Sequence, residues 1–316
     1  MKVSAYPGNK KEFKRFTKKN IIVNLLLVFS YTGLFYFSGQ LRSEHILLAV
    51  LWLLGYYASS TTRKFVLAFS FFILFWVFYD VMRLFPNYTL NTVHIQEPYD
   101  LEKYLFGIDF NGKTLTPNEY FSIENNKILD FLSGFFYLNW MPVPLGFALY
   151  LYYKDKKIFL QYSIAFLLIN IVGFFIYYLY PAAPPWYVDK YGFDLHIGVP
   201  GDRAGLIRFD NLVGMPVFKS IYNKNANVLA AMPSLHSAYP LIVFFYAIKA
   251  KLNTTAIVLF FIFALGIWFS AIYSNHHYAI DVIAGALLAV AGLFLLDRIF
   301  QKKPVKSILE KFAQHI

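Results

Sequence analysis

Cysteine is absent from this chain of 316 residues, and charged residues are scarce. Without cysteine, the protein has no disulfides, no thiolate metal ligands and no cysteine nucleophile. Only 15% of the residues are charged, whereas 58% are hydrophobic and 21% are aromatic; roughly a quarter would be charged in a soluble domain. Apolar stretches of about 18 residues recur, without the sustained alternation typical of an outer-membrane barrel. This composition predicts a polytopic helical membrane protein.

Apolar stretches along the chain predict about eight transmembrane helices, and therefore an all-α integral membrane protein. The first stretch follows a basic tail, and no A-x-A-type cleavage site comes after it. We therefore expect a retained span rather than a removed signal peptide. Two long stretches, 86–127 and 181–232, are expected outside the membrane. The predicted spans are about 21–38, 45–60, 64–85, 128–153, 158–180, 234–250, 253–273 and 277–299.

The distribution of basic residues predicts the orientation. If the N-terminus is cytoplasmic, most of the 29 Lys and Arg residues fall in the two tails and the short inner loops, as the positive-inside rule requires. The net charge of +11 then indicates an anionic lipid surface rather than nucleic acid. In this topology His236 and His277 begin two inward-running helices at the same outer face, so they become possible partners.

The stretch SNHHYAIDVIAG, residues 274–285, places titratable groups at the start of an apolar run. His277 and Asp281 share one face of a helix, so the carboxylate can accept a hydrogen bond from one ring nitrogen. The other nitrogen would then be free to attack phosphorus. A carboxylate within a span is costly, which favours a function. A structural pair at a helix end is equally compatible with these two residues alone.

A second histidine motif, AAMPSLHSAYP at 230–240, predicts a helix start with Ser234 as the N-cap. The amides of such a first turn bind anions, and His236 would be placed to protonate a departing oxygen. The structural alternative is a capped helix whose histidine faces interfacial water. Among the outer-loop cations, Arg208 in GLIRFD is best suited to hold a phosphate at two points. For the others, solvated charge is the better interpretation.

The order P-S-x-H followed by H-x-x-x-D resembles the superfamily of lipid phosphatases and phosphotransferases called type 2 phosphatidic acid phosphatases (PAP2). Further motifs are similar to its fungal inositol phosphorylceramide synthase branch. The resemblance covers about 130–300 and implies a six-helix catalytic core. We therefore expect N-terminal spans and an outer interfacial segment at 1–127, the core at 128–300 and a basic cytoplasmic tail at 301–316. The motifs are YPAAPPWY (180–187), KYG (190–192), PGDRAGLIRFD (200–210), AAMPSLHS (230–237) and HHYAIDVIAG (276–285).

The resemblance implies a role for each matching residue. His277 corresponds to the nucleophile that forms a phosphohistidine, and Asp281 to the carboxylate that orients it. His236 corresponds to the acid that protonates the leaving alcohol and then acts as base toward the acceptor. Arg208 corresponds to the arginine that holds the phosphate. The family works without a metal, so no cofactor is expected.

The chain departs from the phosphatase pattern at three places, one of which is the lack of a convincing K-x6-R-P motif. Position 235 is Leu where the phosphatases have the Gly of P-S-G-H, and Ser270 is followed by Ala271 rather than arginine. The bulkier Leu235 would narrow the pocket or face lipid. A phosphodiester has fewer charges to neutralise than a phosphomonoester, so the loss of a basic residue favours a transferase.

Other motif residues admit two interpretations each. Trp186 and Tyr187 in PPWY either contact the substrate or anchor the loop at the headgroup boundary. His276 either binds headgroup hydroxyls or caps the helix, and we favour the cap. The segment PYDLEKYLFG within 86–127 predicts an amphipathic helix on the membrane surface, which either shapes lipid entry or packs as a lid.

Together these features predict a membrane enzyme that transfers a phosphoinositol-type headgroup from an inositol phospholipid to a ceramide-like acceptor. We expect a bacterial inner-membrane protein with both termini cytoplasmic and the active site at the periplasmic face. One alternative is a lipid phosphatase or phosphodiesterase that uses water as acceptor. Another is a lipid transporter, which would carry charges at mid-bilayer in several spans. Here the candidate groups gather at one face, which favours the enzyme over the transporter. The sequence does not predict the oligomeric state.

Overall fold

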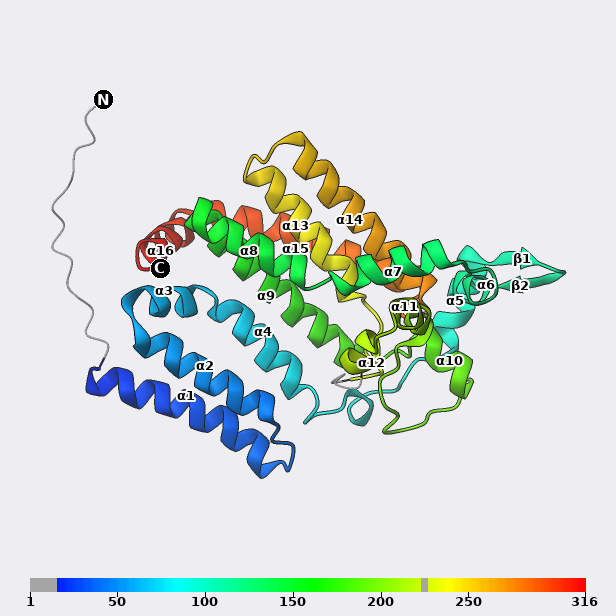
Figure 1. Cartoon of the computed structure of the whole chain (residues 1–316), viewed down its shortest axis with the longest axis horizontal. Coiled ribbons are helices and arrows are strands. Elements are labelled where there is room, and N and C mark those ends of the chain that lie inside the picture. The colour runs from blue at the N-terminus through cyan, green and yellow to red at the C-terminus, as the bar shows by residue number, and fades with distance from the viewer. Residues whose placement is uncertain (1–15, 223–226) are drawn as a thin grey trace. The chain divides into compact units, whose positions relative to one another are not determined.

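The computed structural model describes residues 16–222 and 227–316, which are mostly helical (Figure 1). The chain forms two compact units, one extending to Ser70 with 315–316, the other covering 71–314. Among the described residues, four helices, α1, α9, α14 and α15, are each long and apolar enough to cross a membrane, and α3 with α4 would make a fifth, broken span. The predicted all-α integral membrane fold is therefore confirmed. The basic residues before Phe16 lie outside the described residues, and the functional boundaries at 127 and 300 remain predictions.

The first unit is held by polar contacts between apolar helices. Asn24 on α1 is buried, and its amide oxygen accepts a hydrogen bond from Trp52 Nε1 on α2 at 2.7 Å. Its amide nitrogen donates to the Tyr57 hydroxyl, also on α2, at 3.3 Å. Because lipid tails are as apolar as leucine, such hydrogen bonds give membrane helices much of their pairing specificity. The helices are α1 (Lys18–Phe37), α2 (Ser43–Ala58) and α3 (Ser60–Ala68).

The second unit contains a helical bundle in which α13 packs between α14 and α15, and α9 packs against both α13 and α15 (Figure 1). The predicted span at 128–153 is wrong as one helix, because the chain breaks between Leu138 and Pro142. A proline cannot donate a backbone hydrogen bond and is suited to a helix start. The bundle helices are α4 (Ser70–Val81), α7 (Lys127–Leu138), α8 (Pro142–Lys154), α9 (Lys156–Leu179), α13 (Leu235–Lys249), α14 (Thr254–Tyr273) and α15 (Ala279–Gln301).

Two segments outside the bundle, 86–126 and 181–233 (described as 181–222 and 227–233), lie near the end of the bundle where α13 and α15 begin, and an amphipathic helix, α16 (Lys303–Ala313), follows α15. The first segment includes a hairpin whose strands pair antiparallel, with Ile108 opposite Leu115. Its turn is Asn111–Gly112, both at positive φ, as a tight two-residue hairpin turn requires. The elements are η1 (Asn87–Thr89), α5 (Gln96–Phe106), β1 (Ile108–Phe110), β2 (Lys113–Leu115), α6 (Pro117–Ile123), α10 (Pro185–Tyr191), η2 (Ala204–Leu206), α11 (Ile207–Val213) and α12 (Val217–Tyr222).

The close crossing of α13 and α15 depends on Gly285. A Cβ built on this glycine would overlap the backbone carbonyl of Ser234 and the hydroxyl of Ser237. The Ser237 hydroxyl donates to Ser234 O at 2.7 Å and approaches Val282 O at 2.9 Å. The absence of a side chain at 285 therefore allows the start of α13 to lie against the first turns of α15.

Gly285→Ala is expected to destabilise the protein strongly, because the added methyl group meets backbone atoms that cannot rotate away. Overpacking of this kind costs about 1–3 kcal/mol or more. The measurement is the thermal midpoint of the purified protein in detergent. Gly146→Ala on α8 is the matched control, since no atom lies within 4 Å of its added Cβ. Equal midpoints for the two variants would contradict the role assigned to Gly285.

Candidate active site

The two histidine motifs meet at the starts of α13 and α15. His236 Nδ1 lies 3.2 Å from His277 Nε2, so these two ring nitrogens are within hydrogen-bond distance. The backbone joins the same motifs, because Ser234 N donates to Asp281 O at 2.9 Å. The proximity expected from topology is therefore present in the structure. The catalytic roles of the two histidines remain predictions.

The pair of His277 and Asp281 is formed at a helix start rather than on a helix face. Helix α15 begins at Ala279, so His277 precedes it. Asp281 Oδ2 accepts a hydrogen bond from Tyr278 N at 2.9 Å and lies 3.5 Å from His277 Nδ1. Asp281 is fully buried and His277 is nearly so. The carboxylate is thus hydrogen-bonded to the helix start, while the nearby His277 Nδ1 is buried with no hydrogen-bond partner among the described residues.

Ser234 occupies the predicted N-cap position of α13, but its side chain makes no capping hydrogen bond. Its hydroxyl is buried, with no hydrogen-bond partner among the described residues. Leu235 is also buried, and its side chain packs against Gly173 of α9 rather than facing lipid. The Ser234 hydroxyl and the first-turn amides of α13 are therefore the groups at this helix start suited to an anion.

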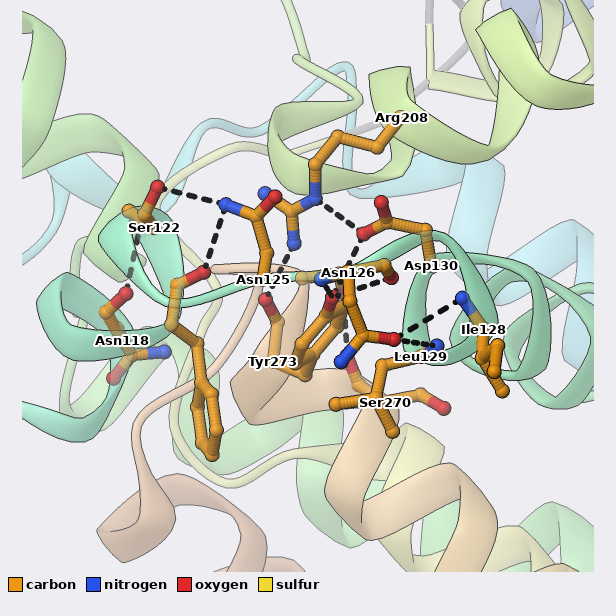
Figure 2. A network of polar contacts seen from close by, with 12 residues as sticks. Asn118, Ser122, Asn125, Asn126, Ile128, Leu129, Asp130, Arg208, Ser270 and Tyr273 are labelled. Carbon is orange, nitrogen blue, oxygen red and sulfur yellow. Dashed lines mark hydrogen bonds and ion pairs between the residues drawn. The ribbon is translucent and has the colours of Figure 1, made fainter.

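Arg208 is held beside the end of α14 by a network of polar contacts (Figure 2). Its Nε donates to Asp130 Oδ1 at 2.5 Å, and its Nη2 donates to Tyr273 O at 3.1 Å. The Tyr273 hydroxyl donates to the same Asp130 oxygen at 2.8 Å. The guanidinium carbon lies 4.9 Å from the centre of the Tyr273 ring. Arg208 is therefore fixed against Tyr273, the residue that ends α14 just before the loop carrying His277.

His276 is enclosed by aromatic rings. It stacks with Tyr222 at 4.4 Å and with Tyr137 at 5.3 Å between ring centroids. Its Nε2 lies 3.0 Å from Arg203 O, which accepts a hydrogen bond if that nitrogen is protonated. Burial lowers the pKa of His276 to about 3, so its ring stays neutral. These contacts connect the segment 181–233 to the loop before α15. The favoured interpretation of His276 as a helix cap is wrong, because the N-cap of α15 is Tyr278. The binding of headgroup hydroxyls by His276 remains a prediction.

Trp186 and Tyr187 are buried within the segment 181–233, where they pack with Ile95 and Leu229. The Tyr187 hydroxyl donates to Asp194 O at 3.1 Å. Because both rings are buried, neither is exposed at the headgroup boundary. Their contact with substrate remains a prediction.

Sequence reasoning missed two residues of the segment 86–126 that contact the chain around His277. Glu102 on α5 accepts hydrogen bonds from Ala279 N at 2.9 Å and Ile280 N at 3.1 Å. Asn118 on α6 donates to His277 O at 2.9 Å. The predicted amphipathic helix does form as α5, with Tyr104 exposed on one side and Glu102 fully buried on the other. Because the apolar residues Leu101, Tyr104 and Leu105 lie on the exposed side of α5, no sequence signal marked Glu102 as buried.

The site offers protein nitrogen and oxygen groups rather than a cluster of metal ligands. Within 16–222 and 227–316, no three His, Asp or Glu side chains come together to hold a metal ion. The chemistry that the geometry supports is nucleophilic attack by an imidazole, with a second imidazole for proton transfer.

Comparison with known proteins identifies the family. A model of the PAP2 superfamily matches residues 117–295, so the chain belongs to this superfamily. It is 44% identical over 278 residues to the phosphoinositol dihydroceramide synthase of Bacteroides thetaiotaomicron, covering 87% of this chain and 91% of that protein. It is 35% identical over 127 residues to the inositol phosphorylceramide synthase catalytic subunit of Saccharomyces cerevisiae, covering 38% of this chain and 30% of that protein. No solved structure matches significantly.

Raising the pH is expected to lower the stability of the protein relative to Glu102→Gln. Burial raises the pKa of Glu102 to about 7, although the amides of Ala279 and Ile280 oppose this shift. The unfolded chain has an ordinary value of about 4.3. The folded state therefore binds the proton more tightly. The stability contributed by this proton is fully present below the pKa of Glu102 in the unfolded chain. It is lost as the pH rises through the pKa of Glu102 in the folded protein.

Thermal midpoints of both proteins in detergent, measured from pH 5 to 8, test this expectation. The midpoint of the wild type should fall relative to the variant over this range and level off above the pKa. A constant difference at all pH values would contradict it.

Proposed function

We propose that this membrane protein transfers a phosphoinositol headgroup from an inositol phospholipid to a ceramide-like alcohol and releases diacylglycerol. The observation that carries the mechanism is the 3.2 Å separation of His236 Nδ1 and His277 Nε2 beside a buried carboxylate. The substrate class is supported by the similarity over most of both chains to a phosphoinositol dihydroceramide synthase. The same similarity supports an enzyme rather than a lipid transporter.

In the first step, His277 Nε2 attacks the donor phosphorus. The new N–P bond forms as the bond from phosphorus to the diacylglycerol oxygen breaks, and protonated His236 supplies the proton for that oxygen. Asp281 accepts the Nδ1 hydrogen bond of His277, which keeps the lone pair on Nε2. The 3.5 Å separation tightens when substrate binds, as catalytic hydrogen bonds commonly do.

In the second step, the acceptor hydroxyl attacks the phosphohistidine. Its oxygen forms the new P–O bond, the N–P bond breaks, and the hydroxyl proton passes to His236, which is then ready for another cycle. Arg208, the Ser234 hydroxyl and the first-turn amides of α13 stabilise the charge on the phosphoryl oxygens.

The proposed orientation places this site at the outer, periplasmic face of a bacterial inner membrane. Helix α9 has 24 residues from Lys156 to Leu179, a length of about 36 Å. Its basic start carries Lys156 and Lys157, whereas Tyr177 near its other end donates to Pro233 O beside the site. The positive-inside rule therefore supports a cytoplasmic position for the start of α9.

His277→Ala is expected to abolish transfer, with a loss of at least about 10³-fold in kcat because the nucleophile is removed. The assay uses purified protein in detergent, a labelled inositol phospholipid, and reactions with and without ceramide. All lipid and water-soluble products are identified. His196→Ala is the matched control, because this histidine is exposed in the segment 181–233.

The products separate the alternatives. A labelled phosphoinositol lipid that requires ceramide and disappears in His277→Ala supports the proposal. Release of water-soluble inositol phosphate regardless of ceramide would identify a hydrolase. Full turnover by His277→Ala would rule out the proposed nucleophile.

Arg208→Lys is expected to lower kcat/KM about 10²-fold, since an ammonium group cannot reproduce the contacts of a guanidinium that stabilises phosphoryl charge. Arg203→Lys is the matched control, because Arg203 forms an ion pair with Asp210 at 2.7 Å within the same segment. The same assay measures both variants. Equal losses in both would show that Arg208 serves only the folding of this segment.

A further inference from the structure

The start of α15 is capped by a side chain from a distant segment. Glu102 on α5 is fully buried and accepts hydrogen bonds from Ala279 N and Ile280 N, one through each carboxylate oxygen. These are the first two residues of α15. In Figure 1, α5 lies beside α6 and the β1–β2 hairpin, and it packs against α15.

The amides of a helix start usually find their acceptors within the same few residues. A carboxylate at the third helical position, such as Asp281, is well placed to supply one. Here Asp281 accepts from the amide of Tyr278, before the first helical residue. Its Oδ1 has no hydrogen-bond partner among the described residues, while its Oδ2 lies 3.5 Å from His277 Nδ1. Because Glu102 accepts from the amides of Ala279 and Ile280, Asp281 accepts only from Tyr278 and stays directed toward the imidazole of His277.

We propose that Glu102 is a positioning residue for phosphoryl transfer, which caps α15 in place of Asp281 and so keeps Asp281 aligned with His277. This inference rests on the catalytic roles proposed above for His277 and Asp281. Without Glu102, two buried amides lose their acceptors, and leaving such groups unsatisfied is costly. Asp281 would then turn toward them and away from the imidazole.

The cap also bears on where the substrate phosphate binds. The amides of Ala279 and Ile280 already have a carboxylate partner, so they are unavailable to a second anion. The start of α13 remains, where the Ser234 hydroxyl has no partner among the described residues. Glu102 therefore directs the phosphate away from the helix that follows the nucleophile and toward the helix that carries His236.

The test compares Glu102→Gln, Asp281→Asn and the double variant in the ceramide-dependent transfer assay. Gln keeps the size of the side chain but places an NH₂ group against one backbone amide. Misalignment of a catalytic group costs up to about 10²-fold in kcat, and we expect Glu102→Gln to approach this loss with KM nearly unchanged. If Glu102 acts through Asp281, the double variant should be no slower than Asp281→Asn alone.

Glu119→Gln is the matched control. Glu119 is a carboxylate of the same segment, 86–126, that also caps a helix, by accepting from Thr116 N at 2.7 Å at the start of α6. Its Oε1 accepts from the Tyr99 hydroxyl on α5 at 2.9 Å, but Glu119 makes no hydrogen bond to α15 among those of the described residues, so kcat should be retained. Thermal midpoints identify variants that fail to fold. If Glu102→Gln does not fold, Glu102→Asp takes its place, because it keeps the charge but draws the carboxylate back by one methylene.

The outcomes are distinguishable. Wild-type kcat in Glu102→Gln would overturn the inference, and so would losses that multiply in the double variant, because Glu102 would then act independently of Asp281. Full activity of Asp281→Asn would instead overturn the proposed catalytic role of Asp281, and the inference would fall with it. The positioning role would be established if Glu102→Gln lowers kcat, the double variant is no slower than Asp281→Asn alone, and Glu119→Gln stays active.

Discussion

The contact between the starts of α13 and α15 is the constraint on which the rest of the site depends. Ser234 N donates to Asp281 O, and this backbone hydrogen bond sets the distance between the two histidine motifs. It forms because Gly285 and Ser237 are small enough for the helices to cross closely. In a membrane, close backbone approach through small residues is a main source of helix pairing. The same packing that stabilises the bundle thus brings His236 and His277 together.

This arrangement buries two carboxyl groups, and hydrogen bonds to local partners offset part of the cost of their charge. Asp281 is fully buried, and so is Glu102. A buried carboxylate is tolerated when hydrogen bonds satisfy it, and the amides at the start of α15 supply these bonds to both residues. The positive end of the helix dipole favours negative charge at the same place. The helix start therefore holds both carboxyl groups, and that of Asp281 lies 3.5 Å from the imidazole of His277.

The sequence predicted the contacts that topology alone can give. Apolar stretches and basic loops placed His236 and His277 at one face, and the structure confirms that these residues are neighbours. Sequence could not reveal partners that depend on tertiary folding. Glu102 meets Ala279 across 177 residues, and Asp130 meets Arg208 across 78. The split of 128–153 into two helices was also missed, because its apolar composition continues through the break before Pro142.

The charge balance around the site bears on the kind of phosphate that it accepts. Arg208 is paired with Asp130, Arg203 with Asp210, and Lys190 with Asp202. Each of these cations of the segment 181–233 therefore has part of its charge already compensated by a carboxylate. A phosphomonoester dianion requires more uncompensated positive charge than a phosphodiester, which carries a single negative charge. The neutral His276 adds none. A site with this balance is better matched to a phosphodiester lipid, and so to headgroup transfer, than to the hydrolysis of a lipid phosphate.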